Sequence, residues 1–181
     1  MVLQRNSSEA PFRAACVSDA GRVRSSNQDR CEMMSNPNLF IVADGMGGHR
    51  AGETAAEVIV TLLPQMLSRR LQAVSSPRPR ILELILRETI VALSQRLWAE
   101  SANQVELQGM GSTIALALLH GNHAYLAHMG DSRIYQFRDA RLTQLTEDHS
   151  ATALLLKYGD ITPEEAQNHP ARGKLSRYVG M

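Results

Sequence analysis

The sequence lacks the marks of a membrane-bound or exported protein. No apolar run approaches the ~20 residues that a membrane-spanning helix needs. Residues 1–11 have no apolar core of the kind found in a signal peptide, and we expect a flexible lead there. Nineteen Lys and Arg against 18 Asp and Glu leave a net charge of +1, so no overall field favours nucleic acid or a membrane surface. These absences predict a soluble cytoplasmic protein.

Cysteine is scarce, and two common nucleotide-binding motifs are absent. Cys16 and Cys31 make neither a disulfide framework nor a zinc site, so we expect buried free thiols. There is no Gly-x-x-x-x-Gly-Lys-Ser/Thr loop. The glycines after residue 44 miss the Gly-x-Gly-x-x-Gly spacing, because Arg50 stands where the third glycine belongs. The usual support for a nucleotide site is therefore missing.

One stretch, residues 40–53, organises the rest of the chain. Four apolar residues, Phe40-Ile41-Val42-Ala43, lead into Asp44, and four glycines follow within eight residues. A short apolar run bounded by glycines predicts a buried strand, which places Asp44 at its end. The glycines let a ligand approach the backbone, and the start of a following helix suits an anion. The stretch is predicted to hold a hard cation on Asp44 with a phosphate beside it, or to be a simple acidic turn.

The order of the predicted elements indicates the fold class. Apolar periodicity predicts three strands, two long helices, four strands and then short helices, with Pro64 expected to kink or break the first helix near Leu63. The ranges are strands at 12–18, 30–35, 39–43, 114–119, 124–129, 134–137 and 142–146, and helices from residue 53, at 82–101, at 150–158 and from Thr162. This order predicts one α+β domain with antiparallel sheets and segregated helices.

Three carboxylates lie at predicted strand ends or turns: Asp29, Asp44 and Asp131. Each alone is typical of a turn, but together they form an oxygen-only ligand set that favours Mg²⁺ or Mn²⁺. Arg24 lies five residues before Asp29, and its guanidinium matches two phosphate oxygens, although a solvated surface arginine would look the same. His49, beside the glycines, is a candidate proton donor or a capping residue.

Asp148-His149-Ser150 invites a catalytic-triad interpretation, which we reject. Adjacent residues cannot point at one another as a triad requires. Asp148 is instead predicted to cap the helix that follows.

Five motifs in order carry a resemblance to a known family. They are Arg24-x-x-Asn27-x-Asp29, Asp44-Gly45-Met46-Gly47-Gly48-His49, Gly111-Ser112-Thr113, Gly130-Asp131-Ser132-Arg133 and Thr146-Glu147-Asp148-His149-Ser150. The series resembles the metal-dependent protein phosphatases of type 2C (PPM) in their compact bacterial form, over residues 12–181. The resemblance implies two antiparallel sheets packed as a sandwich between helices. It also implies hydrolysis of phosphoserine and phosphothreonine by a metal-activated water at a binuclear Mn²⁺ or Mg²⁺ site, acting on a phosphorylated protein made by a cognate Ser/Thr kinase.

The resemblance also implies roles for single residues. Asp44 would bridge two metal ions and the Gly45 carbonyl would bind one of them. Arg24 would hold the substrate phosphate, and Asp29 would order metal-bound water. Asp131 matches the position that helps to bind a third ion.

Two departures from the family pattern matter. Met46 stands where some relatives carry a histidine, so the general acid is unassigned. After Asp160 the sequence contains no aspartate, whereas the family has further strands with an Asp-Gly and an Asp-Asn motif that complete the metal site. We therefore expect an incomplete domain at 12–181 with unpaired sheet edges. The alternatives are a non-catalytic phosphoprotein-binding module and a phosphatase of small phosphate esters.

Overall fold

The computed structural model describes residues 2–5 and 12–181, which form nine strands and four α-helices. The described strands are β1 (Val2–Arg5), β2 (Ala14–Val17), β3 (Asp29–Ser35), β4 (Asn38–Met46), β5 (Gly111–Ser112), β6 (Ile114–His120), β7 (His123–Met129), β8 (Tyr135–Arg138) and β9 (Arg141–Gln144). The helices are α1 (His49–Gln72), α2 (Pro79–Asn103), α3 (Ala151–Tyr158) and α4 (Pro163–Gln167), with a 3-10 turn at Val105–Leu107. The predicted α+β class is confirmed.

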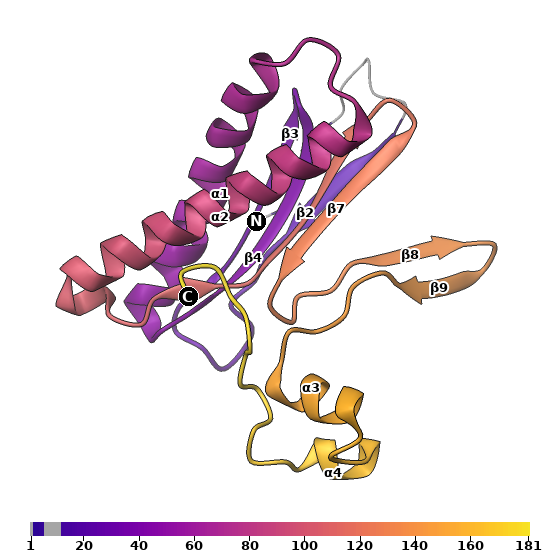
Figure 1. The fold of residues 1–181 in the computed structure, drawn as a ribbon. Helices are drawn as coiled ribbons and strands as arrows, with labels where there is room; N and C mark the ends of the chain where they lie inside the picture. The colour runs from indigo at the N-terminus through magenta and orange to yellow at the C-terminus, as the bar shows by residue number, and fades with distance from the viewer. Residues whose placement is uncertain (1, 6–11) are drawn as a thin grey trace.

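The main sheet is antiparallel, with strand order β3-β4-β6-β7 and β5 paired to the end of β4 (Figure 1). Among the described residues, the other strands form two separate antiparallel pairs, β1–β2 and β8–β9. β4 lies inside the sheet, between β3 and β6. Its burial alternates along the strand, so that Leu39, Ile41 and Ala43 face the core. This alternation matches the period of a strand with one face covered.

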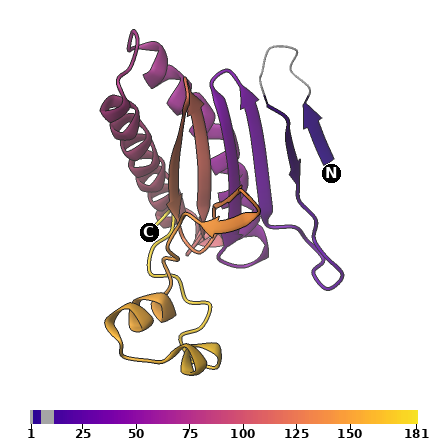
Figure 2. The ribbon, with the colours of Figure 1, turned by 90° about the vertical axis from the view of Figure 1, so that its right-hand side faces the viewer.

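The two long helices cover one face of the main sheet, as Figures 1 and 2 show. In α1 the buried residues recur every fourth position, which places them on one face of the helix; in α2 the spacing is three and four. The core between helices and sheet contains Ala55, Ile59, Leu63 and Leu67 from α1, Leu82, Leu86, Leu93 and Leu97 from α2, and Leu39, Ile114, Leu116 and Leu118 from the sheet. None of the described helices has both the length and the apolar character needed to cross a bilayer.

Several expectations about local structure are corrected. Helix α1 runs without a break through Pro64, because its buried face packs against the sheet along its length and offsets the hydrogen bond that proline removes. The expected flexible lead contains β1, which pairs with β2; residues 1 and 6–11 lie outside the described part of the chain. Cys16 and Cys31 form a disulfide that joins β2 to β3, since neighbouring strands bring the two side chains together across 15 residues of sequence.

The last residues return to the sheet. Val179 is fully buried, and its backbone exchanges hydrogen bonds of 3.0 and 2.9 Å with Ser112. The segment that carries α3 and α4 is closed on itself by a bridge between Ser150 and Leu175, and the His149 amide ties its start to the Gly130 carbonyl at 2.9 Å. A capping box at Thr162 starts α4, and Gly159 closes α3 in the left-handed conformation.

Candidate metal and phosphate site

Two of the three candidate carboxylates lie side by side on adjacent strands. Asp44 on β4 and Asp29 on β3 are direct partners in the antiparallel register. Directly opposed residues of such a pair have Cβ atoms about 5 Å apart. The sheet therefore brings together two acids that are 15 positions apart in the sequence.

The backbone of Asp44 is fixed by the motif around Ser112 and Thr113. Asp44 donates its N–H to the Thr113 hydroxyl at 3.0 Å, and its carbonyl accepts from the Thr113 amide at 2.9 Å and from the Ser112 hydroxyl at 2.9 Å. Both side chains are buried. Three hydrogen bonds fix the backbone of this residue, so the sheet sets the position from which its carboxylate extends.

Glycine is required next to Asp44 because two backbones meet there. A Cβ added to Gly45 would overlap the carbonyl of Gly52 in the first turns of α1. A side chain at Gly52 would in turn meet the Gly45 backbone at 2.9 Å. The glycine spacing that the sequence displays thus lets the helix start pack directly on the strand end.

A network of polar residues holds the loop that carries Arg24. Asn27 donates to the Ser18 hydroxyl at 2.7 Å and accepts from the Asp29 amide at 3.0 Å, which closes a tight turn. Arg30 donates to the carbonyls of Asn27 and Asp29 at 2.7 and 3.0 Å, and to Glu53 and Glu57 on α1 at 2.7 and 2.8 Å. The loop is thereby tied both to its own turn and to the helix.

The charges around Asp44 are unbalanced. Burial of the carboxylate, the negative charge of Asp29, a hydrogen bond shared with Asp29 and the charge of Asp131 raise the pKa of Asp44 from 3.8 to about 6, while the nearby charge of Arg24 lowers it. The residue as a whole remains accessible to solvent, so the carboxylate is shielded at the base of a hollow and not enclosed. A cluster of carboxylates that repel one another is the electrostatic arrangement that a dication stabilises.

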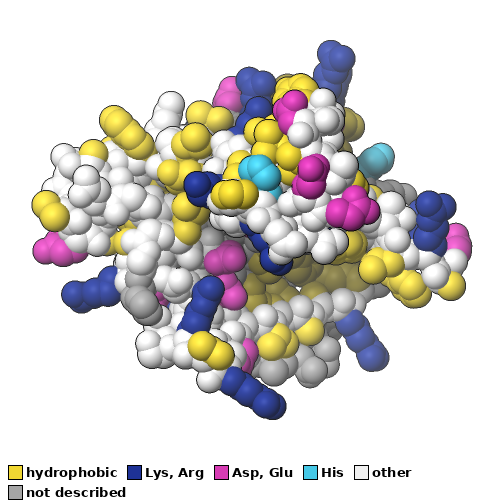
Figure 3. Space-filling view, turned by 90° about the horizontal axis from the view of Figure 1, so that it is seen from below, with side chains coloured by type: hydrophobic (Ala, Val, Ile, Leu, Met, Phe, Trp, Pro, Cys, Tyr) yellow, Lys and Arg dark blue, Asp and Glu magenta, His cyan; other side chains and the backbone are white. Residues whose placement is uncertain are grey.

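That hollow has a volume of about 300 Å³ and is lined by Asp19, Asp29, Asp44 and Ser132, among others. Figure 3 shows acidic and basic side chains meeting near the centre of this face, beside a depression with hydrophobic walls. In the described part of the chain, no group of three His, Cys, Asp or Glu side chains is close enough to hold an ion. The donor chemistry of these residues fits a hard cation, of whose shell they would supply a part; carbonyls, waters or other groups would supply the remainder.

The comparisons with known proteins identify the family. The family model described as protein phosphatase 2C matches residues 20–169. The chain belongs to the protein phosphatase 2C family. The serine/threonine phosphatase stp of Listeria monocytogenes is 37% identical over 166 residues, which cover 90% of this chain and 65% of that protein. The serine/threonine protein phosphatase PstP of Mycobacterium tuberculosis is 37% identical over 92% of this chain and 30% of its own length.

Solved structures of protein phosphatase 2C relatives share the fold. The crystal structure of Stp1 from Staphylococcus aureus superposes with a TM-score of 0.77 at 33% identity and covers 91% of this chain and 64% of its own. A PstP catalytic domain in complex with two manganese ions has a TM-score of 0.69 at 31% identity, over 99% of this chain and 66% of its own. The chain thus spans just under two thirds of the length of the first of these relatives.

Most of the candidate residues predicted from the sequence can be located in the structure of this protein phosphatase 2C chain. The charges of Asp29, Asp131 and Arg24 all act on Asp44. The role of His49 stays a prediction, because its side chain lies outside the described part of the chain.

The expected helix cap at Asp148 is wrong. Ser150 caps α3 through its hydroxyl, while Asp148 forms a two-pronged ion pair with Arg133 at 2.6 and 2.8 Å. A fork-to-fork pair with a guanidinium is stronger than a cap formed through one oxygen.

Sequence reasoning missed the contacts that support the site. Arg30 reaches a partner 23 positions away, and nothing in the local pattern signals this contact. Thr113 belongs to one of the five motifs, but its hydrogen bond with Asp44, 69 positions away, could not be inferred from that motif. Asn27 belongs to one of the five motifs, but only the structure shows that it closes the turn beside Asp29. Asp19 also lines the hollow, and its place after a predicted strand was the one available signal.

Proposed function

We propose that this chain is part of a metal-dependent protein serine/threonine phosphatase that hydrolyses phosphoserine and phosphothreonine in proteins phosphorylated by a Ser/Thr kinase. The proposal is supported by the family membership and by the pairing of Asp29 with Asp44, within reach of the charges of Asp131 and Arg24. The cofactor would be Mn²⁺ or Mg²⁺, with two ions at the main site and a third, weaker one near Asp131.

The proposed roles follow from what each group offers. Asp44 and the Gly45 carbonyl would hold the main ions, and Asp29 would orient water beside them. Bound dications supply Lewis acidity, which polarises the phosphate and acidifies water. Arg24 would clamp two phosphate oxygens with its guanidinium fork, which fixes the phosphorus for in-line attack.

The single observation that carries the proposal is the direct pairing of Asp29 with Asp44 across β3 and β4, since it sets two carboxylates together where a cation is needed. The raised pKa of Asp44 agrees with it. The test measures manganese-dependent release of phosphate from a phosphothreonine peptide by the wild type and by Asp44→Asn. We expect the variant to lose the activity. Manganese-dependent release that survives Asp44→Asn would refute the assignment of Asp44.

A second candidate is a phosphoprotein-binding module without hydrolysis. It is favoured by the lack of three clustered ligand side chains among the described residues. Calorimetry with the same phosphopeptide, with and without Mn²⁺, tests it in wild type and Arg24→Ala. Arg24-dependent binding without release of phosphate supports the module; no binding under either condition removes it.

A phosphatase of small phosphate esters would use the same residues. Turnover of phosphopeptides and of small phosphate esters at equal concentration distinguishes it from a protein phosphatase. A preference for the esters would refute the proposed substrate class.

A further inference from the structure

The strand β7 ends the main sheet on the side away from the disulfide. Among the described strands it pairs only with β6, through a two-residue turn in which Gly121 has φ +56°. In a two-residue hairpin the residues that flank the turn, here His120 and His123, form a hydrogen-bonded pair. Along β6 and β7, hydrogen-bonded and non-hydrogen-bonded pairs then alternate, and the residues of β7 in the non-hydrogen-bonded pairs have backbone groups that point away from β6. Leu126 and His128 therefore direct their backbone N–H and C=O groups toward the open edge.

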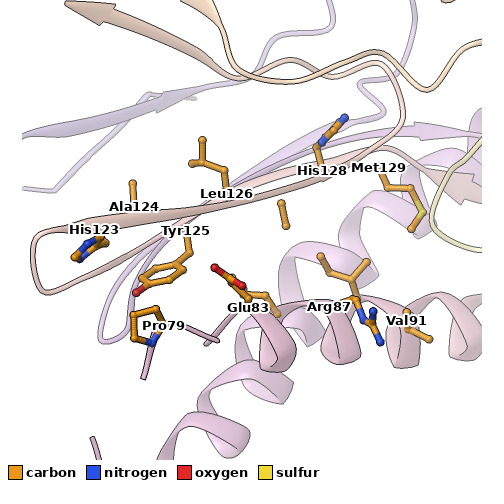
Figure 4. Close-up of a pocket in the computed structure, with 13 residues that line it drawn as sticks. Pro79, Glu83, Arg87, Val91, His123, Ala124, Tyr125, Leu126, His128 and Met129 are labelled. Carbon is orange, nitrogen blue, oxygen red and sulfur yellow. The ribbon is translucent and has the colours of Figure 1, made fainter. Parts of the chain in front are cut away.

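A groove of about 620 Å³ runs between this edge and α2. Figure 4 shows β7 above the helix, with Tyr125 and Met129 on the helix side and Leu126 and His128 on the other. The groove combines open backbone groups with exposed apolar surface, since Val91 is 46% exposed and Leu126 38% exposed. A surface of this kind accepts another β-strand.

The flank of α2 that lines the groove carries two opposite charges. Glu83 and Arg87 both line the groove and are both exposed, and within the described part of the chain no ion pair engages either. They are one helical turn apart, about 6 Å, which is close to the spacing of two strand residues. In Figure 4 Glu83 lies nearer to Tyr125 and Leu126, and Arg87 lies nearer to His128 and Met129. The residue between these two pairs in the sequence of β7 is Ala127.

A two-fold axis at Ala127 would satisfy the open backbone groups of Leu126 and His128 and pair the charges on α2. Leu126 would pair with the partner's His128 and the reverse, forming about four backbone hydrogen bonds. Ala127 would face its own copy at a non-hydrogen-bonded position, where backbones approach most closely and a small side chain fits. Tyr125 would lie against the partner's Met129, a favourable sulfur–aromatic contact. Glu83 would face the partner's Arg87, and Arg87 the partner's Glu83.

We propose that the edge of β7 and the adjoining flank of α2 bind the same surface of a second copy of this chain, forming a two-fold symmetric dimer with one continuous sheet. An unrelated strand could satisfy the backbone groups. An acid and a base one helical turn apart on the flank of α2, beside a strand with a small residue at position 127, fit a self-complementary interface, in which Glu83 of each copy meets Arg87 of the other.

The test is the oligomeric state of the chain, measured by sedimentation velocity over a range of concentrations. The wild type is expected to be a dimer that dissociates on dilution. Glu83→Arg and Arg87→Glu should each weaken dimerisation at least ten-fold, because each replaces two opposite-charge contacts by like-charge contacts. The combined variant Glu83→Arg/Arg87→Glu should recover it. Glu106→Arg, a change of equal charge in the 3-10 turn, is the matched control and should have no effect.

Leu126→Pro tests the strand edge separately. It removes an N–H that faces solvent in the monomer, which an edge strand tolerates, so circular dichroism should stay unchanged while the dimer is lost. A wild type that is monomeric at every concentration overturns the proposal. So does a dimer that survives Leu126→Pro, or a double charge reversal that fails to restore assembly.

Discussion

Replacing Asp44 by Asn should have opposite effects on stability with and without metal. In the metal-free chain, the Asp44 carboxylate is destabilised by burial and by the charges of Asp29 and Asp131. An amide removes that charge, and it can donate a hydrogen bond to Asp29. We expect Asp44→Asn to be more stable than the wild type in a chelator, and less stable than the wild type in saturating Mn²⁺.

The magnitude follows from the shift in pKa. A rise from 3.8 to about 6 is roughly two units, or ~3 kcal/mol if no screening applied. Because the residue is accessible to solvent, we reduce this to about 1 kcal/mol. For a chain of this length that corresponds to a melting temperature about 2–4 °C higher in the variant. In Mn²⁺ at a hundred times its Kd, the wild type would gain about 2.7 kcal/mol, which the variant would forgo.

The pH dependence gives a second check. The folded chain holds the Asp44 proton more tightly than the unfolded chain does, because the pKa of Asp44 is raised in the folded state. The loss of stability caused by the charged carboxylate is therefore absent below about pH 4, grows between about pH 4 and 6, and is complete above that range. Thermal melts in chelator across this range measure the difference between wild type and variant. A variant that is less stable than the wild type at neutral pH in chelator, or a difference that does not change with pH, would refute the electrostatic reasoning.

Three further substitutions probe the support of the site. Arg30→Leu should lower the free energy of unfolding by about 2 kcal/mol in chemical denaturation, because two partly exposed ion pairs and two hydrogen bonds to the backbone are lost together. Gly45→Ala should cost more than ~3 kcal/mol or prevent folding, since its Cβ would overlap the Gly52 carbonyl; expression yield and melting temperature measure it. Ser150→Ala should cost about 1 kcal/mol in thermal melts, because the amide of Ala153 loses its cap.

Controls separate these effects from general sensitivity. Arg96→Leu, which breaks one exposed pair with Glu100 within the same helix, should cost less than about 0.5 kcal/mol. Equal losses for Arg30→Leu and Arg96→Leu would contradict the supporting role of Arg30. Gly45→Ala with an unchanged melting temperature would mean that the strand end and α1 are not in contact. A Ser150→Ala variant as stable as the wild type would show that the hydroxyl contributes nothing to α3.

Local patterns in the sequence were enough to predict most elements. Period-two and period-3.6 patterns located the strands and helices because one face of each is buried, and the glycines after Asp44 marked a close backbone approach. The sequence analysis grouped Asp29 and Asp44 in one ligand set but did not predict that they are direct partners across two strands. The physical basis of this pairing is the register of β3 on β4, which a single sequence does not specify.

What the sequence could not predict depends on contacts between distant segments. The disulfide between Cys16 and Cys31 needs the placement of β2 beside β3. Pro64 was expected to interrupt α1, but packing outweighs the local preference of a single residue. The burial of Val179 depends on its bridge to Ser112, which lies 67 positions earlier in the sequence. Each is a tertiary effect with no local signature.

The contact between Gly45 and Gly52 has a mechanical consequence. It is made by main-chain atoms alone, so no rotamer change can loosen it and no side chain can cushion it. The first turns of α1 and the tip of β4 must therefore shift, tilt or unfold together. In hydrogen exchange, the amides on the two sides of this contact should open as one unit, and a ligand seated on the strand tip should slow both alike.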